Sequence, residues 1–182
     1  MIGKFKTLSL FIISLLILSG CGTVNVQDYQ NLNPELRIED YFQGETKAWG
    51  IFQERFGKVR RRFTVDIVGT WDEAEQTLKL VEDFDYDDGE KEQRIWTINK
   101  TGENTYTGSA DGVVGEATGI TSGNAFNFKY TFDLPVEGKT WRVKFDDWMY
   151  LQDDNVLFNK ATIYRWGFRL GDVYIFFDKR NK

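Results

Sequence analysis

The chain has 182 residues, with 23 lysines and arginines against 28 aspartates and glutamates, 16% aromatic residues, no histidine and one cysteine. Without histidine there is no Ser-His-Asp or Cys-His nucleophile pair and no histidine-ligated metal, and a single cysteine excludes an intramolecular disulfide framework. The acidic balance argues against a nucleic-acid partner, which normally meets a basic face.

The first twenty residues predict a signal peptide. Lys4 and Lys6 precede an almost wholly apolar stretch, residues 8–18, which is too short for a typical spanning helix. The stretch ends in residues 18–21 (LSGC), which resemble the bacterial lipobox. This resemblance implies that Cys21 is lipidated and becomes the first residue after cleavage. The alternative is a generic secretory signal beside an unpaired cysteine.

Lipidation at Cys21 would make the membrane a permanent partner, because several acyl chains anchor a protein almost irreversibly. Gly22 rather than aspartate follows the cysteine. By resemblance to lipoproteins of two-membrane bacteria, this favours anchoring to the outer membrane with the domain facing the periplasm. Residues 21–35 are polar and lack periodicity, so they predict a lipidated tether, and residues 36–182 predict a single domain.

From about residue 47 onward the pattern is that of strands. Residues 62–71, 124–132 and 140–145 alternate apolar and polar side chains, as strands of antiparallel sheet do when one face is buried. Short turn signals separate about nine or ten such segments, and only residues 33–41 suggest a helical turn. A long meander most economically closes on itself, because closure removes unpaired edges. The sequence therefore predicts an all-β fold, an antiparallel up-and-down barrel of about eight to ten strands, with a β-sandwich as the alternative.

Two charged residues are predicted on the inner face of one hairpin. Alternation along residues 77–86 and 93–98 places Glu82 on one inner face and Arg94, beside Trp96, on the other. A two-residue turn between the strands would leave Arg94 diagonal to Glu82 rather than directly opposite it. Such a pair could orient the polar head of a ligand inside a barrel, or it could be a structural ion pair.

Carboxylates concentrate at two further places. Residues 83–90 resemble a calcium loop in their alternating acids, but the glycine is misplaced and Arg94 stands where a bidentate acid is needed, so a solvated turn is expected and no metal. In the second place, alternation turns Asp147 inward and Asp146 outward. These two cannot act as a catalytic pair, although a desolvated Asp147 could titrate near neutrality. Structural hydrogen bonding is the alternative role.

A glycine-rich segment and a basic run each have a structural and a functional interpretation. The glycines of residues 106–120 lack the setting of a phosphate-binding loop and predict bends or close backbone approach in a barrel. The basic run of residues 58–62 could contact anionic lipid headgroups or form a solvated edge.

Several short motifs together carry a resemblance to a known family. They are residues 18–21 (LSGC), 62–63 (RF), 82–90 (EDFDYDDGE), 94–96 (RIW), 123–125 (GNA), 146–150 (DDWMY) and 159–161 (NKA). The set resembles a bacterial family of small lipoproteins known only as a domain of unknown function, over essentially the whole mature domain. That family implies no catalytic role for any position. The expected barrel also resembles that of lipocalins.

These observations predict a non-catalytic envelope lipoprotein that binds an apolar or amphipathic molecule, such as a lipid, inside its barrel without a cofactor. The alternative is a structural or partner-binding lipoprotein of an envelope complex with a filled core. An enzyme that uses Asp147, Glu82 or Tyr106 as acid or base is a third class. The residues expected to line the ligand site are Glu82, Arg94, Trp96, Tyr106, Phe128, Tyr130 and Asp147.

Overall fold

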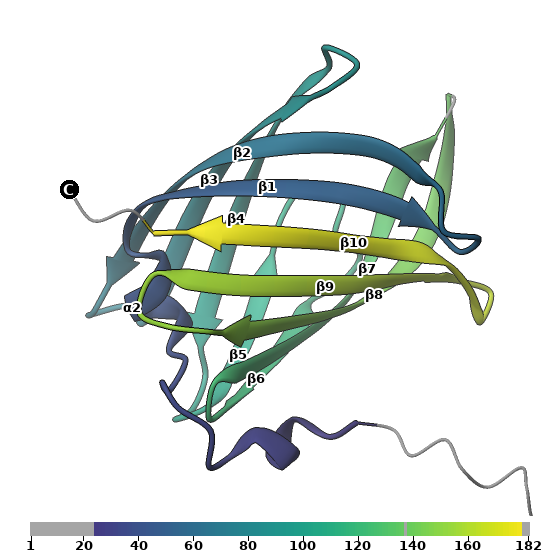
Figure 1. Ribbon diagram of the computed structural model, residues 1–182. Coiled ribbons are helices and arrows are strands. Elements are labelled where there is room, and N and C mark those ends of the chain that lie inside the picture. Colours follow the sequence, from purple (N-terminus) through teal and green to yellow (C-terminus); the bar gives the residue numbers. More distant parts are fainter. Residues whose placement is uncertain (1–23, 137, 180–182) are drawn as a thin grey trace, which may run out of the picture.

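The computed structural model describes residues 24–136 and 138–179. Cys21 and the signal segment lie outside these residues, so signal cleavage and lipidation stay predictions. Within the described residues no helix is long and apolar enough to cross a membrane. The described chain forms a 3-10 helix, a short α-helix and ten strands (Figure 1). In chain order these are η2 (Val26–Tyr29), α2 (Ile38–Phe42), β1 (Gly44–Glu54), β2 (Val59–Asp72), β3 (Thr77–Tyr86), β4 (Lys91–Lys100), β5 (Thr105–Ser109), β6 (Ala117–Ser122), β7 (Ala125–Val136), β8 (Lys139–Leu151), β9 (Val156–Arg165) and β10 (Phe168–Asp178).

The strands form one closed antiparallel barrel. Each strand pairs with its neighbours in the sequence, and β1 pairs with β10 from Lys47 opposite Asp178 to Glu54 opposite Gly171. The predicted up-and-down barrel is therefore confirmed, and the sandwich alternative is wrong. Alternation is clear in β2, where every second residue from Phe63 to Gly69 is buried and the residues between them are exposed or half-buried.

Helix α2 plugs one end of the barrel, which we call the closed end (Figure 1). Ile38, Tyr41 and Phe42 are buried there, and the ring of Phe42 meets that of Phe177 edge-on at 5.6 Å between centroids. The opposite end, where β1 turns into β2 and β9 into β10, carries no such plug among the described residues, and we call it the mouth. The barrel is thus closed by a helix at one end.

The segment that precedes α2 packs against the outside of the barrel. The ring of Tyr29 lies 6.0 Å from that of Trp148 and 5.3 Å from that of Tyr150, and the backbone N–H of Leu36 donates to the carbonyl of Gly123 at 2.8 Å. Aromatic burial thus orders the described part of the predicted tether. The helical turn expected near residues 33–41 occurs at Ile38–Phe42.

The hairpin between β3 and β4 differs by one residue from the predicted register. The N–H of Tyr86 donates to the carbonyl of Glu90 at 3.0 Å, which leaves a three-residue loop that ends at Gly89 with φ +88°. A glycine in the left-handed region closes loops of this length, so the two-residue turn was the wrong expectation. As a consequence Glu82 lies directly opposite Arg94 instead of diagonal to it.

Candidate functional site

A cavity of about 370 Å³ occupies the barrel. It extends from Phe42 of α2 at the closed end to Arg61 and Leu134 near the mouth, and its walls come from every strand except β5 and β6. At ~30 Å³ per water molecule the volume equals that of about twelve waters, and it lies within the ~300–1,000 Å³ range of small-molecule sites. The filled interior of the alternative interpretation is therefore wrong for this barrel.

Polar side chains form a band halfway along this otherwise apolar cavity. Glu82 and Arg94 face each other on β3 and β4, while Asp147 and Asn159 line the wall formed by β8 and β9. Tyr130 of β7 belongs to the same lining. Each sits at an inward position of its strand, so the period-two pattern alone brings the band together.

Glu82 has an unusual environment for a carboxyl group. Burial raises its pKa to about 7, the negative charges of Asp147 and Glu92 raise it as well, and Arg94 opposes them. Desolvation favours the neutral form of an acid, so near neutral pH this group exchanges a proton readily and can donate or accept a hydrogen bond.

Asp147 is the second carboxyl of the band. Its side chain faces inward and is buried, whereas Asp146 accepts a hydrogen bond from Asn127 at 2.8 Å and lies 3.9 Å from Lys129. Burial raises the pKa of Asp147 to about 7, and the hydrogen bond donated by Asn159 Nδ2 opposes this rise. The adjacent aspartates thus have different environments, as alternation requires.

The charge of Arg94 is balanced within the cavity wall. Its guanidinium lies 2.5 Å from a carboxylate oxygen of Glu92 and 5.1 Å from the ring centres of both Phe84 and Phe132. Glu92 in turn accepts a hydrogen bond from the hydroxyl of Tyr86 at 2.9 Å. Arg94 is therefore held in place by groups nearer the mouth, and Glu82 contributes a longer-range attraction.

Three polar groups of the band lack a hydrogen-bond partner among the described residues. They are the Glu82 carboxyl, the Tyr130 hydroxyl and the buried Oδ1 of Asn159. A buried polar atom left without a partner costs about 1–3 kcal/mol, so native proteins normally satisfy such atoms with protein, water or ligand. The band therefore offers both donors and acceptors to a bound molecule.

Aromatic rings make the wall beside this band. Trp96 lies 5.3 Å from both Phe128 and Tyr130, and Tyr130 stacks on Phe145 at 4.8 Å. The inward glycines of β5 and β6 make room for such rings: a Cβ at Gly108 would lie 2.7 Å from the Phe128 ring. The glycine run thus serves close ring approach, one of the two roles that the sequence suggested.

Tyr106 does not join the cavity lining. It lies at the closed end, where its hydroxyl donates to Glu39 at 2.9 Å, and Lys100 Nζ donates to the same carboxyl at 2.6 Å. The other six expected residues line the cavity. Sequence reasoning missed Asn159 as a lining residue, although the alternation Leu157, Asn159, Ala161 marks it as a polar residue at an inward position.

The acidic turn between β3 and β4 pairs with arginines of β2. Asp87 pairs with Arg62 at 3.2 Å, while Asp88 and Glu90 pair with Arg61 at 3.0 and 2.5 Å. Across residues 24–136 and 138–179 no cluster of three or more acids, histidines or cysteines could hold a metal ion. This turn is thus an ion-pair network near the mouth.

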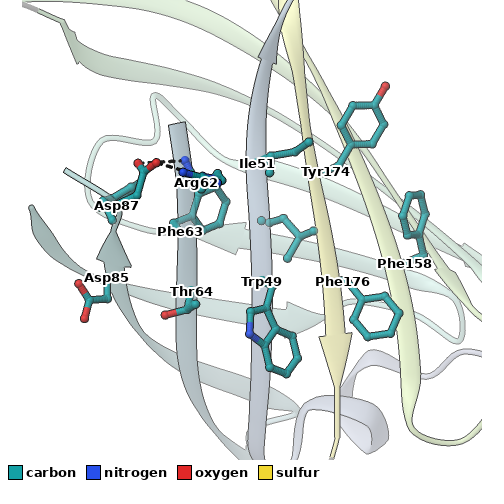
Figure 2. A pocket seen from close by; sticks show the side chains of 13 residues that line it. Trp49, Ile51, Arg62, Phe63, Thr64, Asp85, Asp87, Phe158, Tyr174 and Phe176 are labelled. Atoms are coloured by element: carbon teal, nitrogen blue, oxygen red, sulfur yellow. Dashed lines mark hydrogen bonds and ion pairs between the residues drawn. The ribbon is translucent and has the colours of Figure 1, made fainter. Parts of the chain in front are cut away.

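A second hollow, of about 500 Å³, is lined by residues of β1, β2, β3, β9 and β10 (Figure 2). It contains three exposed aromatic side chains, Trp49, Phe158 and Phe176, with 38%, 39% and 43% of their surface accessible. Figure 2 shows Trp49 and Phe176 beside each other on neighbouring strands, with ring centres 6.4 Å apart. Asp85 and Asp87 lie on its far side. This hollow involves outward-facing side chains of the barrel, whereas the cavity lies inside the barrel.

We expect Glu82→Gln to stabilise the fold above pH 7 and to have little effect near pH 4. The carboxyl ionises near 4.5 when unfolded but near 7 when folded, so stability of the native protein falls as the pH rises through this window. The full difference corresponds to roughly 3 kcal/mol, which cavity water reduces to about 2 kcal/mol. Urea unfolding at both pH values measures it. The outward Asp83→Asn is the control, and an equal effect of Glu82→Gln at both pH values would contradict the assignment.

Fold and cavity together define this protein as a closed ten-stranded antiparallel barrel with an interior site of small-molecule size. The chain belongs to the family described as Protein of unknown function (DUF3833), whose model matches residues 15–179. This agrees with the predicted resemblance to a family of unknown function. No curated protein matches the chain.

Two solved structures share the fold. The S-type phycobiliprotein lyase CPES from Guillardia theta aligns with a TM-score of 0.57 and 9% identity, over 79% of this chain and 92% of that one. A DUF3598-family protein of unknown function from Nostoc punctiforme aligns with a TM-score of 0.56 and 13% identity, over 81% of this chain and 51% of that one. This chain thus spans about half the length of the second protein. At these identities the likeness is one of fold, and the absence of catalysis stays a prediction.

Proposed function

We propose that this protein is a lipid-anchored envelope protein that binds an amphipathic small molecule, such as a lipid, inside its barrel. The observation that carries the proposal is the polar band of Glu82, Arg94, Tyr130, Asp147 and Asn159 inside a mainly apolar cavity. Apolar walls bind a hydrocarbon body by burial, and a few convergent polar groups fix the orientation of a head.

The chemistry of the band favours a hydrogen-bonding head over a strongly charged one. Arg94 already has a carboxylate partner in Glu92, so among the described cavity residues an anionic head would meet no free cation at this depth. Glu82 and Asp147 have pKa values near 7 and can each donate or accept. A hydroxyl, an amide or a protonated carboxylic acid meets both conditions without burying an unpaired charge.

Membrane attachment is the second part of the proposal. The segment from Lys4 to Cys21 supports it through its basic start, apolar run and lipobox-like end. Gly22 after the cysteine supports the outer membrane as the site of anchoring and the periplasm as the compartment of the barrel. Mass spectrometry of the mature N-terminus tests this part, because an acylated Cys21 is expected and an unmodified one contradicts it.

The proposed role is binding without turnover. The polar groups of the described cavity are carboxyl, guanidinium, tyrosine hydroxyl and amide groups. The two carboxyl groups, those of Glu82 and Asp147, belong to β3 and β8, which lie on opposite sides of the barrel. The likeness to a phycobiliprotein lyase is one of fold, so it supports a ligand site in the barrel only as an analogy. A partner-binding role is the second candidate, and the exposed aromatic hollow around Trp49 and Phe176 favours it.

Filling the cavity is expected to abolish ligand binding. Ala161 is buried and lines the cavity, whereas Lys160 beside it is exposed. The full chain, purified from its own envelope, should release a non-covalently bound amphipathic molecule into organic solvent. Ala161→Phe should lower the bound amount at least about tenfold, and Lys160→Phe should leave it unchanged. Equal amounts in both variants, or none in the natural protein, would overturn the proposal.

A further inference from the structure

The three most exposed aromatic side chains of the described chain lie together at the mouth. Phe56 is in the turn between β1 and β2, and Trp166 and Phe168 are at the turn between β9 and β10, with 81%, 82% and 68% of their surface accessible. The two turns are neighbours, because the N–H of Arg55 donates to the carbonyl of Leu170 at 2.9 Å. Figure 1 shows both at the end of the barrel opposite α2. We call residues 55–58 and 165–169 the rim turns.

The rim turns are also cationic. They contain Arg55, Lys58, Arg165 and Arg169 and no acid. The guanidinium of Arg55 lies 4.6 Å from the Phe56 ring centre, and that of Arg165 lies 4.2 Å from that of Trp166. Of these cations only Arg169 has a carboxylate partner among the residues described, in Asp172. Aromatic rings and unpaired cations therefore alternate over one exposed edge.

The basic run predicted from residues 58–62 contributes less to this charge than the sequence suggested. Arg60, Arg61 and Arg62 all make ion pairs, with Glu54, with the pair Asp88 and Glu90, and with Asp87. Lys58 at the tip has no ion pair within the described part of the chain. The cations free to meet a partner are thus those that flank the exposed rings.

Trp166 occupies a backbone position that its side chain does not favour. Its φ is +53° and that of Gly167 is +84°, so the turn has positive φ at both central residues. Asparagine or glycine is preferred at the first of these positions, and a bulky residue there is an outlier. A strained tryptophan with 82% of its surface accessible gains little from packing on the barrel, which points to a role in contact with another surface.

An anionic bilayer surface fits this edge. Tryptophan and phenylalanine favour the interface between headgroups and hydrocarbon, and each arginine or lysine near an anionic membrane adds attraction. The arginine stems can lie along the rings while their heads reach phosphate. The cavity opens at the same end, since Arg61, Leu134 and Pro135 belong to its lining.

We propose that the rim turns dock the mouth of the barrel on an anionic lipid surface, so that an amphipathic ligand moves between bilayer and cavity without crossing bulk water. The docking stands on the exposed rings and free cations alone. The ligand movement rests on the proposed function.

Tryptophan quenching tests the docking with the full chain in vesicles. Vesicles of phosphatidylcholine and phosphatidylglycerol carrying bromine on the acyl chains should quench the natural protein, and Trp166→Asn should lose most of that quenching. Asparagine is preferred at the positive φ of this position, so the Trp166→Asn variant should be at least as stable as the natural protein. Trp71→Phe, at the closed end, is the control and should keep the quenching. Equal quenching in the natural protein and Trp166→Asn would overturn the proposal. So would the absence of quenching by vesicles together with binding of a protein at the rim turns.

A second measurement separates docking from ligand binding. Replacing Arg55, Lys58 and Arg165 together by glutamine should slow transfer of a fluorescent fatty acid from anionic vesicles at least about tenfold, because each lost cation weakens the attraction. Equilibrium binding of the same fatty acid in detergent should not change. Unchanged transfer contradicts the docking, whereas quenching without any fatty-acid binding contradicts only the proposed ligand.

Discussion

Replacing Glu39 by glutamine is expected to lower the free energy of unfolding by about 3–5 kcal/mol, the usual result of breaking a buried ion pair. Glu39 is 1% exposed and accepts hydrogen bonds from Lys100 at 2.6 Å and from Tyr106 at 2.9 Å. Glutamine would leave the largely buried Lys100 ammonium without a counter-charge. Urea unfolding at neutral pH measures the loss.

The Glu39 carboxyl also makes the stability of the closed end sensitive to acid. Burial alone would raise the pKa of Glu39, but the bonds from Lys100, the backbone and Tyr106 outweigh it and hold the pKa below 4.5. Its contribution is therefore present above the ordinary pKa and lost as the pH falls through the folded value. Asp40→Asn, one residue along the helix and exposed, is the matched control and should cost under about 1 kcal/mol. Equal losses in the two variants would show that Glu39 is not the connection between helix and barrel.

Gly69→Ala is expected to cost about 3 kcal/mol and to loosen the closed end. A Cβ on Gly69 would overlap the backbone carbonyl of Phe42, the last residue of α2. Because the obstacle is backbone rather than a flexible side-chain end, relief requires movement of the helix itself, and overpacking of this kind is costly. Thermal unfolding measures the loss, and faster amide exchange in Ile38–Phe42 than in β2 shows where it arises.

Thr70→Ala provides the comparison for that substitution. Thr70 follows on the same strand and its side chain is exposed, so removing it should change stability by no more than about 0.5 kcal/mol. If Gly69→Ala were as mild as Thr70→Ala, α2 would not be seated on β2 as described. Ligand binding should also weaken in Gly69→Ala, since Ile38 and Phe42 form the base of the cavity.

Period-two alternation predicted the strands and the inward direction of Glu82, Arg94 and Asp147. Alternation of apolar and polar residues indicates which face of a strand is buried, and this pattern is a local property of the chain. The register of one hairpin was missed because the loop also includes Asp87, and the same turn composition fits a loop of two residues or of three. The partner of Tyr106 was missed for a different reason: Glu39 is 67 positions away and precedes all strands.

The cavity itself could not be predicted from the sequence. Whether inward aromatic residues fill a barrel or line a space depends on how their volumes add across strands that are far apart in the chain. Phe128, for example, finds room over Gly108, so its ring lies against the wall instead of across the interior. Such packing depends on which residues of different strands lie side by side, and the alternation within one strand does not show this.

The seam between β1 and β10 has a consequence for how the chain acquires its structure. Ala48 pairs with Phe177, so the first strand finds its last partner only when nearly the whole sequence has been synthesised. Until then the edge of β1, with Trp49 and Ile51, is free to pair with any other extended chain. Because such long-range closure is slow, the unfinished barrel is the species most exposed to aggregation. A chain truncated before Phe168 would keep that edge open permanently.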